Sequence, residues 1–212
     1  MRFDQPLNQI FDHEVKLRVL RFLCRRGGQW SGRRLAAELH VNPTTTHKIL
    51  RELRDTTILD FQKVGNNFVY SLADDHYLVQ EILRPAFSQE AQGLAQVATV
   101  LRQALGSALQ GSVVTVVLYG SVARREERPT SDLDVLFLVR SPQAKRQVQH
   151  ALSQHWEALT RRFGNSLAPY VNTMREAQQK SRRGVPLFRE ILKAHQTLWG
   201  KPLEEVLHGR PT

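Results

Sequence analysis

The sequence predicts an α+β fold, in which a small unit of helices and a β-hairpin precedes a unit with a small mixed sheet flanked by helices. Three observations lead to this expectation. Apolar residues recur at helical spacing through residues 11–53. Two short strand-like stretches, residues 58–61 and 68–72, then flank a Gly-Asn-Asn turn. Finally, two apolar runs, residues 113–119 and 135–139, enclose a polar segment, as buried strands do.

Length and charge bound the architecture and the partners. The 212 residues suit one large domain or two small ones, and we expect a first domain at 1–75, a connector at 76–90 and a second domain at 91–212. Lys and Arg number 30 against 20 Asp and Glu, which gives a formal net charge of +10. Such an excess favours a polyanionic partner, and nucleic acid is the first candidate.

The sequence lacks the usual marks of membrane and secreted proteins. Its longest apolar runs fall far short of the roughly 20 residues that span a bilayer. The N-terminus has neither the apolar stretch nor the small-residue cleavage site of a secretory signal. Cys24 is the only cysteine, which excludes an internal disulfide. These features predict a cytoplasmic protein that makes no contact with a membrane.

The first expected helix covers residues 11–26 and is apolar on two sides. One of its stripes belongs to the core of its own domain. Leu17, Leu20 and Cys24 form the second stripe, which needs a separate partner. We expect that partner to be the other domain or a twin subunit, so a homodimer is one expectation.

Two capping residues mark the next helices. Ser31 can cap a helix that runs to about residue 40, and Asn42 before a proline begins a third helix. The free face of the third helix and the hairpin after it carry hydroxyl, imidazole and basic groups: Thr44, Thr45, His47, Lys48, Arg51 and Lys63. Such groups can enter a major groove and bond base edges or phosphates.

Residues 31–50 resemble the core of bacterial winged-helix transcription regulators, and the resemblance covers about residues 8–72. The hairpin, with its turn at Gly65-Asn66-Asn67, corresponds to the wing. The resemblance implies a winged helix-turn-helix domain that binds double-stranded DNA through the residues above. A winged helix that serves only to dock other proteins is the alternative, because a fold alone does not fix function.

Helical spacing continues through residues 77–108, where Pro85 is expected to interrupt the helix. The rest of the second unit is expected to alternate between helices and strands. Helices are expected at 143–163, 173–182 and 186–194, a strand at 166–171, and either a short strand or an extended end at 195–199.

The polar segment between the two apolar runs contains the most informative motif. Gly120 and Ser121 end the first run, and ten residues separate Ser121 from Asp132 at the start of the second. Alternate side chains of a strand point the same way, so Asp132 and Asp134 converge beside the Gly-Ser turn. The turn's backbone N–H groups suit a phosphate, and two carboxylates suit Mg²⁺. The segment therefore predicts a site for a nucleotide with Mg²⁺.

Gly-Ser, about ten residues and Asp-x-Asp before an apolar strand resemble the nucleotidyltransferase superfamily typified by DNA polymerase beta, in its small prokaryotic form. The resemblance covers roughly residues 90–200. It implies that Asp132 and Asp134 are catalytic and hold Mg²⁺, in one or two ions, with an NTP as substrate or ligand. It also implies nucleotide contacts by Gly120, Ser121, Arg124 and Ser131.

Two positions depart from the family pattern. Active members of the superfamily carry a third carboxylate on the next sheet strand, where it helps to bind the metal that activates the attacking hydroxyl. In this chain Pro169 or Asn172 stands where that carboxylate is expected. Arg125 follows Arg124 where the family often has glycine. Both departures leave nucleotide binding in place and leave transfer open.

Three functions fit the sequence. The first is a DNA-binding regulator whose second domain transfers a nucleotide to a protein or small molecule, as similar antitoxin-type enzymes do to partner toxins. The second is a regulator whose second domain binds a nucleotide as a signal without transfer. The third is a protein-binding adaptor without enzymatic activity, which would have no need of the Gly-Ser and Asp-x-Asp residues.

Overall fold

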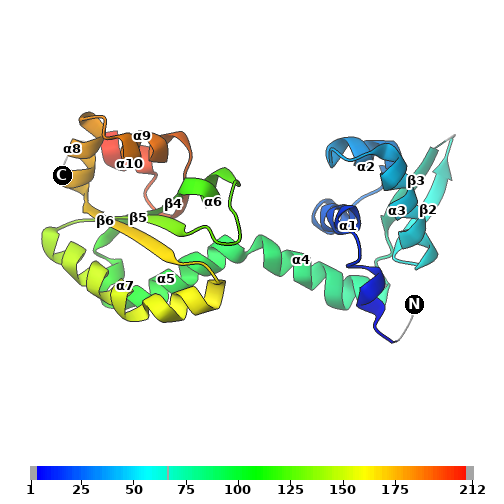
Figure 1. Ribbon diagram of the computed structural model, residues 1–212, viewed down its shortest axis with the longest axis horizontal. Coiled ribbons are helices and arrows are strands. Elements are labelled where there is room, and N and C mark those ends of the chain that lie inside the picture. The colour runs from blue at the N-terminus through cyan, green and yellow to red at the C-terminus, as the bar shows by residue number, and fades with distance from the viewer. Residues whose placement is uncertain (1–3, 66, 209–212) are drawn as a thin grey trace. The chain divides into compact units, whose positions relative to one another are not determined.

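The computed structural model describes residues 4–65 and 67–208 and confirms the α+β class (Figure 1). Residue contacts divide the chain between Gln92 and Gly93 into two compact units, Met1–Gln92 and Gly93–Thr212. Asn66, which the sequence places in the hairpin turn, lies outside the described residues. Within residues 4–65 and 67–208, no helix is long and apolar enough to cross a membrane.

The described part of the first unit contains three α-helices before its hairpin, and the caps of the second and third are those that the sequence predicts. The Ser31 hydroxyl accepts a hydrogen bond from the Arg34 N–H, and Asn42 accepts from the N–H groups of the first turn of α3. The first helix begins later than expected, because His13 caps it and the preceding Phe11 is 45 % exposed. The helices are η1 (Pro6–Gln9), α1 (Glu14–Arg26), α2 (Gly32–Glu38) and α3 (Pro43–Asp55).

A three-stranded antiparallel sheet completes this unit, in the order β1-β3-β2. The hairpin of β2 (Leu59–Val64) and β3 (Asn67–Leu72) follows the prediction. The short strand β1 (Trp30–Ser31) was not predicted, because two residues are too few to show a period. Three helices followed by a hairpin are the arrangement that the winged-helix resemblance implies.

The second apolar stripe of α1 is covered within its own unit, which corrects the expectation that it meets another domain or subunit. Leu20 is fully buried, and Leu17 and Cys24 pack against the same core. That core includes Val79 and Leu83 from the segment expected to be a connector. Leu20 is therefore closed to any partner, while Leu17 and Cys24 are only partly buried.

The helix that covers this stripe passes through Pro85 without stopping. Residues Val79–Leu83 form a π-helical turn, η2, and α4 (Arg84–Ala91) follows it directly. The Arg84 N–H bonds the Val79 carbonyl, five residues back. A widened turn of this kind is how a helix accommodates a residue that lacks an N–H. The predicted interruption is therefore wrong.

The second unit is built on a mixed four-stranded sheet in the order β6-β5-β4-β7. The parallel pair is β5 with β6, and the other neighbours are antiparallel. This is the small mixed sheet that the sequence predicts. The strands are β4 (Val113–Tyr119), β5 (Leu133–Val139), β6 (Leu167–Thr173) and β7 (Gln196–Gly200).

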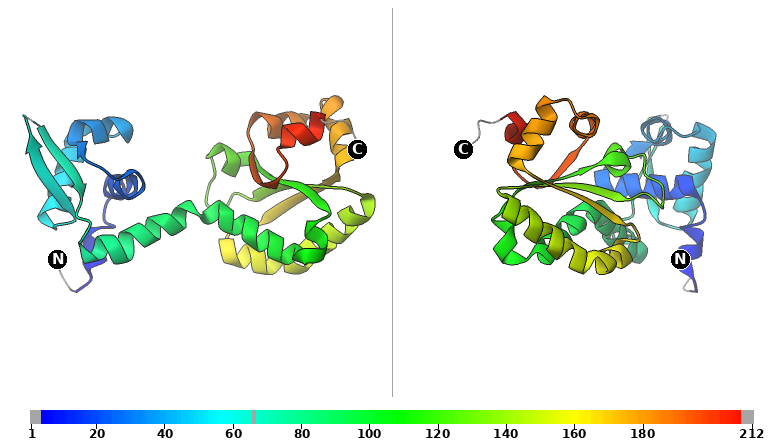
Figure 2. Two further views of the ribbon diagram at one scale, coloured as in Figure 1. Left: turned by 180° about the vertical axis from the view of Figure 1, so that it is seen from behind. Right: turned by 60° about the vertical axis from the view of Figure 1, so that its left-hand side comes forward.

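Helices cover both faces of this sheet (Figure 2). One face packs against α5 (Gly93–Gln110) and α7 (Pro142–Phe163). The opposite face packs against α8 (Met174–Arg182), α9 (Pro186–Lys193) and α10 (Leu203–His208). The last helix was not predicted, since six residues carry little periodicity. Both layers fix the strands that carry the candidate site.

Substitution of Gly200 tests the join between β7 and β4. Gly200 has a φ of +97°, and a Cβ there would overlap the Val114 carbonyl oxygen and lie 2.6 Å from the Thr115 Cα. Because this backbone cannot yield, Gly200→Ala should lower the free energy of unfolding by at least about 1 kcal/mol. Urea denaturation followed by tryptophan fluorescence measures the change.

Gly93→Ala is the matched control, because nothing lies within 4 Å of its Cβ position and its φ is not in the left-handed region. It lies in α5, so alanine there should change stability by less than about 1 kcal/mol and in the stabilising direction. Equal effects of the two substitutions would contradict the packing described for β7.

Candidate functional site

The register of β4 and β5 brings Gly120 and Asp134 together. Tyr119, the last residue of β4, lies opposite Asp134 in β5. Gly120 follows with a φ of +75°, and a Cβ at this position would overlap Asp134 Oδ2 and lie 2.9 Å from the carboxyl carbon. The Asp134 carboxylate thus occupies the space that any other side chain at residue 120 would fill. Glycine is needed here both for its backbone and for this close approach.

Asp132 and Asp134 lie at the same end of β5. Asp132 is exposed just before the strand, and Asp134 is partly buried in its second position. Burial raises the pKa of Asp134, and the negative charge of Asp132 raises it further, while Arg124 acts in the opposite direction. Two carboxylates that repel each other in this way form a site that a divalent cation would stabilise.

The Gly-Ser segment is the start of a short helix rather than the tight turn expected from the sequence. Helix α6 (Gly120–Arg124) follows β4 without a loop, and Ser121 is partly buried in its first turn. Arg125 ends the helix with a φ of +59°, a conformation that favours glycine. This accounts physically for the glycine that the family often has at this position.

Three carboxylates act on Arg124: Glu126 accepts a hydrogen bond from it, and Glu190 and Asp134 act through their charge. Its Nε donates to Glu126 Oε2 at 2.7 Å, and this bond raises the pKa of Arg124, to which Glu190 and Asp134 also contribute. Glu190 lies on α9, and its own pKa is lowered by its hydrogen bond from Lys193 and by Arg124. No motif in the sequence indicates Glu190, because only the packing of α9 on the sheet brings it near α6.

Ser131 shapes the loop before Asp132. Its hydroxyl accepts from the Arg128 N–H at 2.9 Å, and its carbonyl accepts from Asn165 Nδ2 at 2.8 Å. The Ser131 side chain is therefore engaged in the loop, and its effect on a nucleotide would be to position Asp132.

The position beside Asp134 on β6 is not the one that the sequence suggested. Asp134 lies opposite Ala168, and Tyr170 is the next residue on that face. Pro169 belongs to the opposite face, and Asn172 lies four residues beyond Ala168, about 13 Å along the strand. Ala168 and Tyr170 therefore stand where a third carboxylate would lie. The expectation that Pro169 or Asn172 occupies this position is wrong.

Among the described residues, no third acidic or metal-binding side chain joins the pair. Within the part of the chain that the structure describes, no group of three or more His, Cys, Asp or Glu side chains could hold a metal ion. The residues present thus fit one divalent cation held by Asp132 and Asp134. They do not provide the extra carboxylate that a second ion needs.

Aromatic and amine groups occupy the sheet face beyond Asp134. Burial raises the pKa of Tyr119 to about 12, with further contributions from Asp134 and Tyr170. Lys180 on α8 donates from Nζ to the Tyr170 hydroxyl at 2.8 Å and to Asn172 Oδ1 at 2.6 Å. These residues were missed from the sequence because no motif joins β6 to α8.

The residues expected to bind DNA lie mainly on one exposed face of α3. The side chains of Thr44, Lys48 and Arg51 are exposed on this helix, and Thr45 is partly buried. His47 is exposed but close to α2, because a Cβ on Gly32 would lie 2.6 Å from its ring carbon Cε1. Lys63 is exposed on β2, in the wing.

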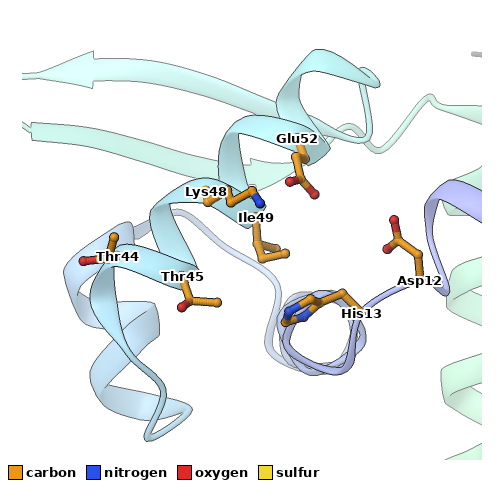
Figure 3. Close-up of a pocket in the computed structure, with 7 residues that line it drawn as sticks. All are labelled: Asp12, His13, Thr44, Thr45, Lys48, Ile49 and Glu52. Carbon is orange, nitrogen blue, oxygen red and sulfur yellow. The ribbon is translucent and has the colours of Figure 1, made fainter.

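A pocket of about 440 Å³ adjoins this face (Figure 3). One wall comes from α3 and the other from the residues just before α1. Asp12 and Glu52 at its edge are both paired with Lys16, which is 3 % exposed, at 2.8 and 3.1 Å. The lining residues are Asp12, His13, Thr44, Thr45, Lys48, Ile49 and Glu52. Since charges of both signs line it, the pocket is not selective for anions.

A match to a known protein family falls within the second unit. Residues 98–181, which lie within this unit, match the family model of the nucleotidyltransferase domain. The matched segment includes Gly120, both aspartates and strand β6. No curated protein sequence matches the chain significantly.

Among solved structures, the chain is similar to the crystal structure of the AntR antimony-specific transcriptional repressor. The two are 26% identical, and the similarity covers 41% of this chain and 75% of that one. The TM-score is 0.35, which is too low to support an argument about fold or function.

Stability against pH tests the electrostatics of the carboxylate pair. A carboxyl group whose pKa is raised by folding destabilises the fold as pH rises from about 3.9 through its folded pKa. Asp134→Asn should therefore raise the melting temperature at pH 7 in the absence of divalent ions. The gain should shrink as the pH falls through the folded pKa, and it should vanish well below about 3.9, where the wild-type carboxyl is protonated in both states.

Asp60→Asn, an exposed position in β2, controls for the loss of a surface charge. Melting curves of the three proteins between pH 4 and pH 8 make the comparison. A loss of stability at pH 7 in Asp134→Asn would contradict the repulsion described for this pair.

Proposed function

We propose that the protein is a DNA-binding transcription regulator whose nucleotidyltransferase domain binds an NTP with Mg²⁺. The observation that carries the nucleotide part is the placement of the Asp134 carboxylate against Gly120, with Asp132 close by. These residues fall within the segment that matches the nucleotidyltransferase family.

Each residue of this site has a distinct task in the proposal. Asp132 and Asp134 hold the ion, which neutralises phosphate charge when it is bound. The backbone at Gly120 and the hydroxyl of Ser121 donate hydrogen bonds to a phosphate at the start of α6. Arg124 reaches the nucleotide by exchanging its bond to Glu126 for a phosphate oxygen.

The DNA part rests on the exposed face of α3 and on the charge of the chain. Thr44, Lys48 and Arg51 present hydroxyl and basic groups on a helix that follows a short turn, and Lys63 extends the surface onto the wing. The net charge of +10 favours a polyanion. We further propose a homodimer on DNA, because helix-turn-helix proteins read two half-sites about 34 Å apart.

Nucleotide transfer to an acceptor, such as a partner toxin or a small molecule, is the other candidate. It requires a hydroxyl that a metal activates for attack on the α-phosphate. Ala168 and Tyr170 beside Asp134 offer no carboxylate for that metal. This arrangement favours binding of the nucleotide as a signal over its transfer.

Arg51→Ala tests DNA binding. If Arg51 reads a base, its removal should weaken specific binding by about 1–3 kcal/mol, and wild-type binding should fall steeply as salt rises. Fluorescence anisotropy on selected genomic fragments measures both effects. Arg26→Ala, an exposed arginine at the end of α1, should leave affinity nearly unchanged.

Absence of any sequence preference at every salt concentration would refute the regulator proposal. Equal losses from Arg51→Ala and Arg26→Ala would show instead that binding depends only on total charge.

Asp132→Ala and Asp134→Ala test the nucleotide site. Wild type should melt at a higher temperature with Mg²⁺ and an NTP, because a ligand at 100 times its Kd stabilises by about 2.7 kcal/mol. Either substitution should abolish this shift, since one carboxylate cannot hold the ion. Glu127→Ala, an exposed carboxylate in the same loop, should keep it. A shift that survives in both aspartate variants would place the nucleotide elsewhere.

A further inference from the structure

The sheet face beside Asp134 carries an ammonium group in the region where active nucleotidyltransferases hold a third carboxylate. On β6, Ala168 lies opposite Asp134, and Tyr170 is the next residue on the same face. The Tyr170 hydroxyl accepts from Lys180 Nζ at 2.8 Å. An amine on α8 is thus anchored to the strand that should supply an acidic side chain.

The environment of Lys180 is suited to a charged ligand. The ammonium is half-buried, and its bonds go to Tyr170 and to Oδ1 of Asn172, which is fully buried. An ammonium has three N–H donors, and within the described residues two of them have acceptors. Nζ also lies over the Tyr170 ring, 5.0 Å from its centroid, and its third N–H has no acceptor among the described residues.

Tyr119 links this group to the aspartate pair. It lies opposite Asp134 in β4, and burial, followed by the negative charge of Asp134, raises the pKa of its hydroxyl. Helix α9 closes the same face, since Phe188 packs against Tyr170 with ring centroids 6.3 Å apart. Lys180 and Asp134 therefore lie on the same face of the sheet, the face that α8 and α9 cover.

Charge balance indicates what Lys180 does. In an active nucleotidyltransferase, the second Mg²⁺ and the third carboxylate together add one positive charge, and one ammonium adds the same. Lys180 can therefore balance phosphate charge without a second ion. It cannot replace that ion in catalysis, because an ammonium has no lone pair to take the proton of an attacking hydroxyl.

We propose, on the basis of the nucleotide site above, that the domain binds a nucleoside triphosphate with a single divalent ion. Lys180 supplies the second positive charge, and the bound nucleotide acts as a signal that is not transferred. Lys180 is then a binding residue specific to the polyphosphate, and its removal should matter more for a triphosphate than for a monophosphate.

Counting ions with Mn²⁺ tests the first part. Electron paramagnetic resonance at saturating ATP should find one bound Mn²⁺ per wild-type chain and no release of pyrophosphate. Ala168→Asp puts a carboxylate opposite Asp134 and should allow a second Mn²⁺ to bind. Two ions on wild type, or release of pyrophosphate by it, would overturn the inference.

Lys180 variants test the second part. Lys180→Gln should weaken Mg-ATP binding about tenfold, the factor that the loss of one good charged contact gives, and AMP binding much less. Lys180→Arg should restore most of the affinity. Lys145→Gln is the matched control, because it removes an equally charged, hydrogen-bonded lysine at Glu176. The Lys145→Gln variant should bind ATP with the same affinity as wild type.

Tyr170→Phe separates binding from packing, since it removes the bond to Lys180 but keeps the charge. If Lys180 only stabilised the fold, Lys180→Gln would be less stable and would bind both ATP and AMP more weakly, by the same factor. Tyr170→Phe would then behave in the same way. That result, or unchanged ATP binding in Lys180→Gln, would refute the inference. If wild type bound no NTP, the proposed nucleotide site itself would fail, which is a different outcome.

Discussion

The close approach of the Asp134 carboxylate to the backbone of Gly120 is the constraint on which the candidate site depends. It requires a residue without a side chain directly after β4 and the register that places Tyr119 opposite Asp134. That register is held by apolar residues on both faces of β4 and β5, which pack against two layers of helices. The cost of bringing two carboxylates together is thus offset by a well-packed sheet, as is common at functional sites.

Short-range patterns in the sequence predicted most of what is local. Cap preferences at Ser31 and Asn42 predicted the starts of α2 and α3, which the structure confirms. The shared direction of Asp132 and Asp134, which strand alternation predicts, stays a prediction. Apolar runs predicted the individual strands β4 and β5 of the second unit. All of these depend on residues that are close together in the chain, where periodicity and capping chemistry act directly.

What the sequence could not predict depends on contacts between distant segments. The second apolar stripe of α1 packs against residues that follow residue 78. An apolar stripe shows that a helix face is buried, but it does not show which segment buries it. The partner of Asp134 on β6 depends on a parallel register, and an error of one residue moves every side chain to the other face. For this reason the sequence points to Pro169 or Asn172 as the position of the third carboxylate, whereas the register places Ala168 opposite Asp134.

The central claim is that Asp132, Asp134 and Gly120 form one site for a divalent ion with a nucleotide. The most direct measurement is the broadening of backbone amide NMR signals by substoichiometric Mn²⁺ in the presence of ATP. Broadening falls off steeply with distance from the ion, so it should be strongest at Gly120, Ser121 and residues 132–134 and absent from α3. Broadening centred on another part of the chain, or none at all, would contradict the account.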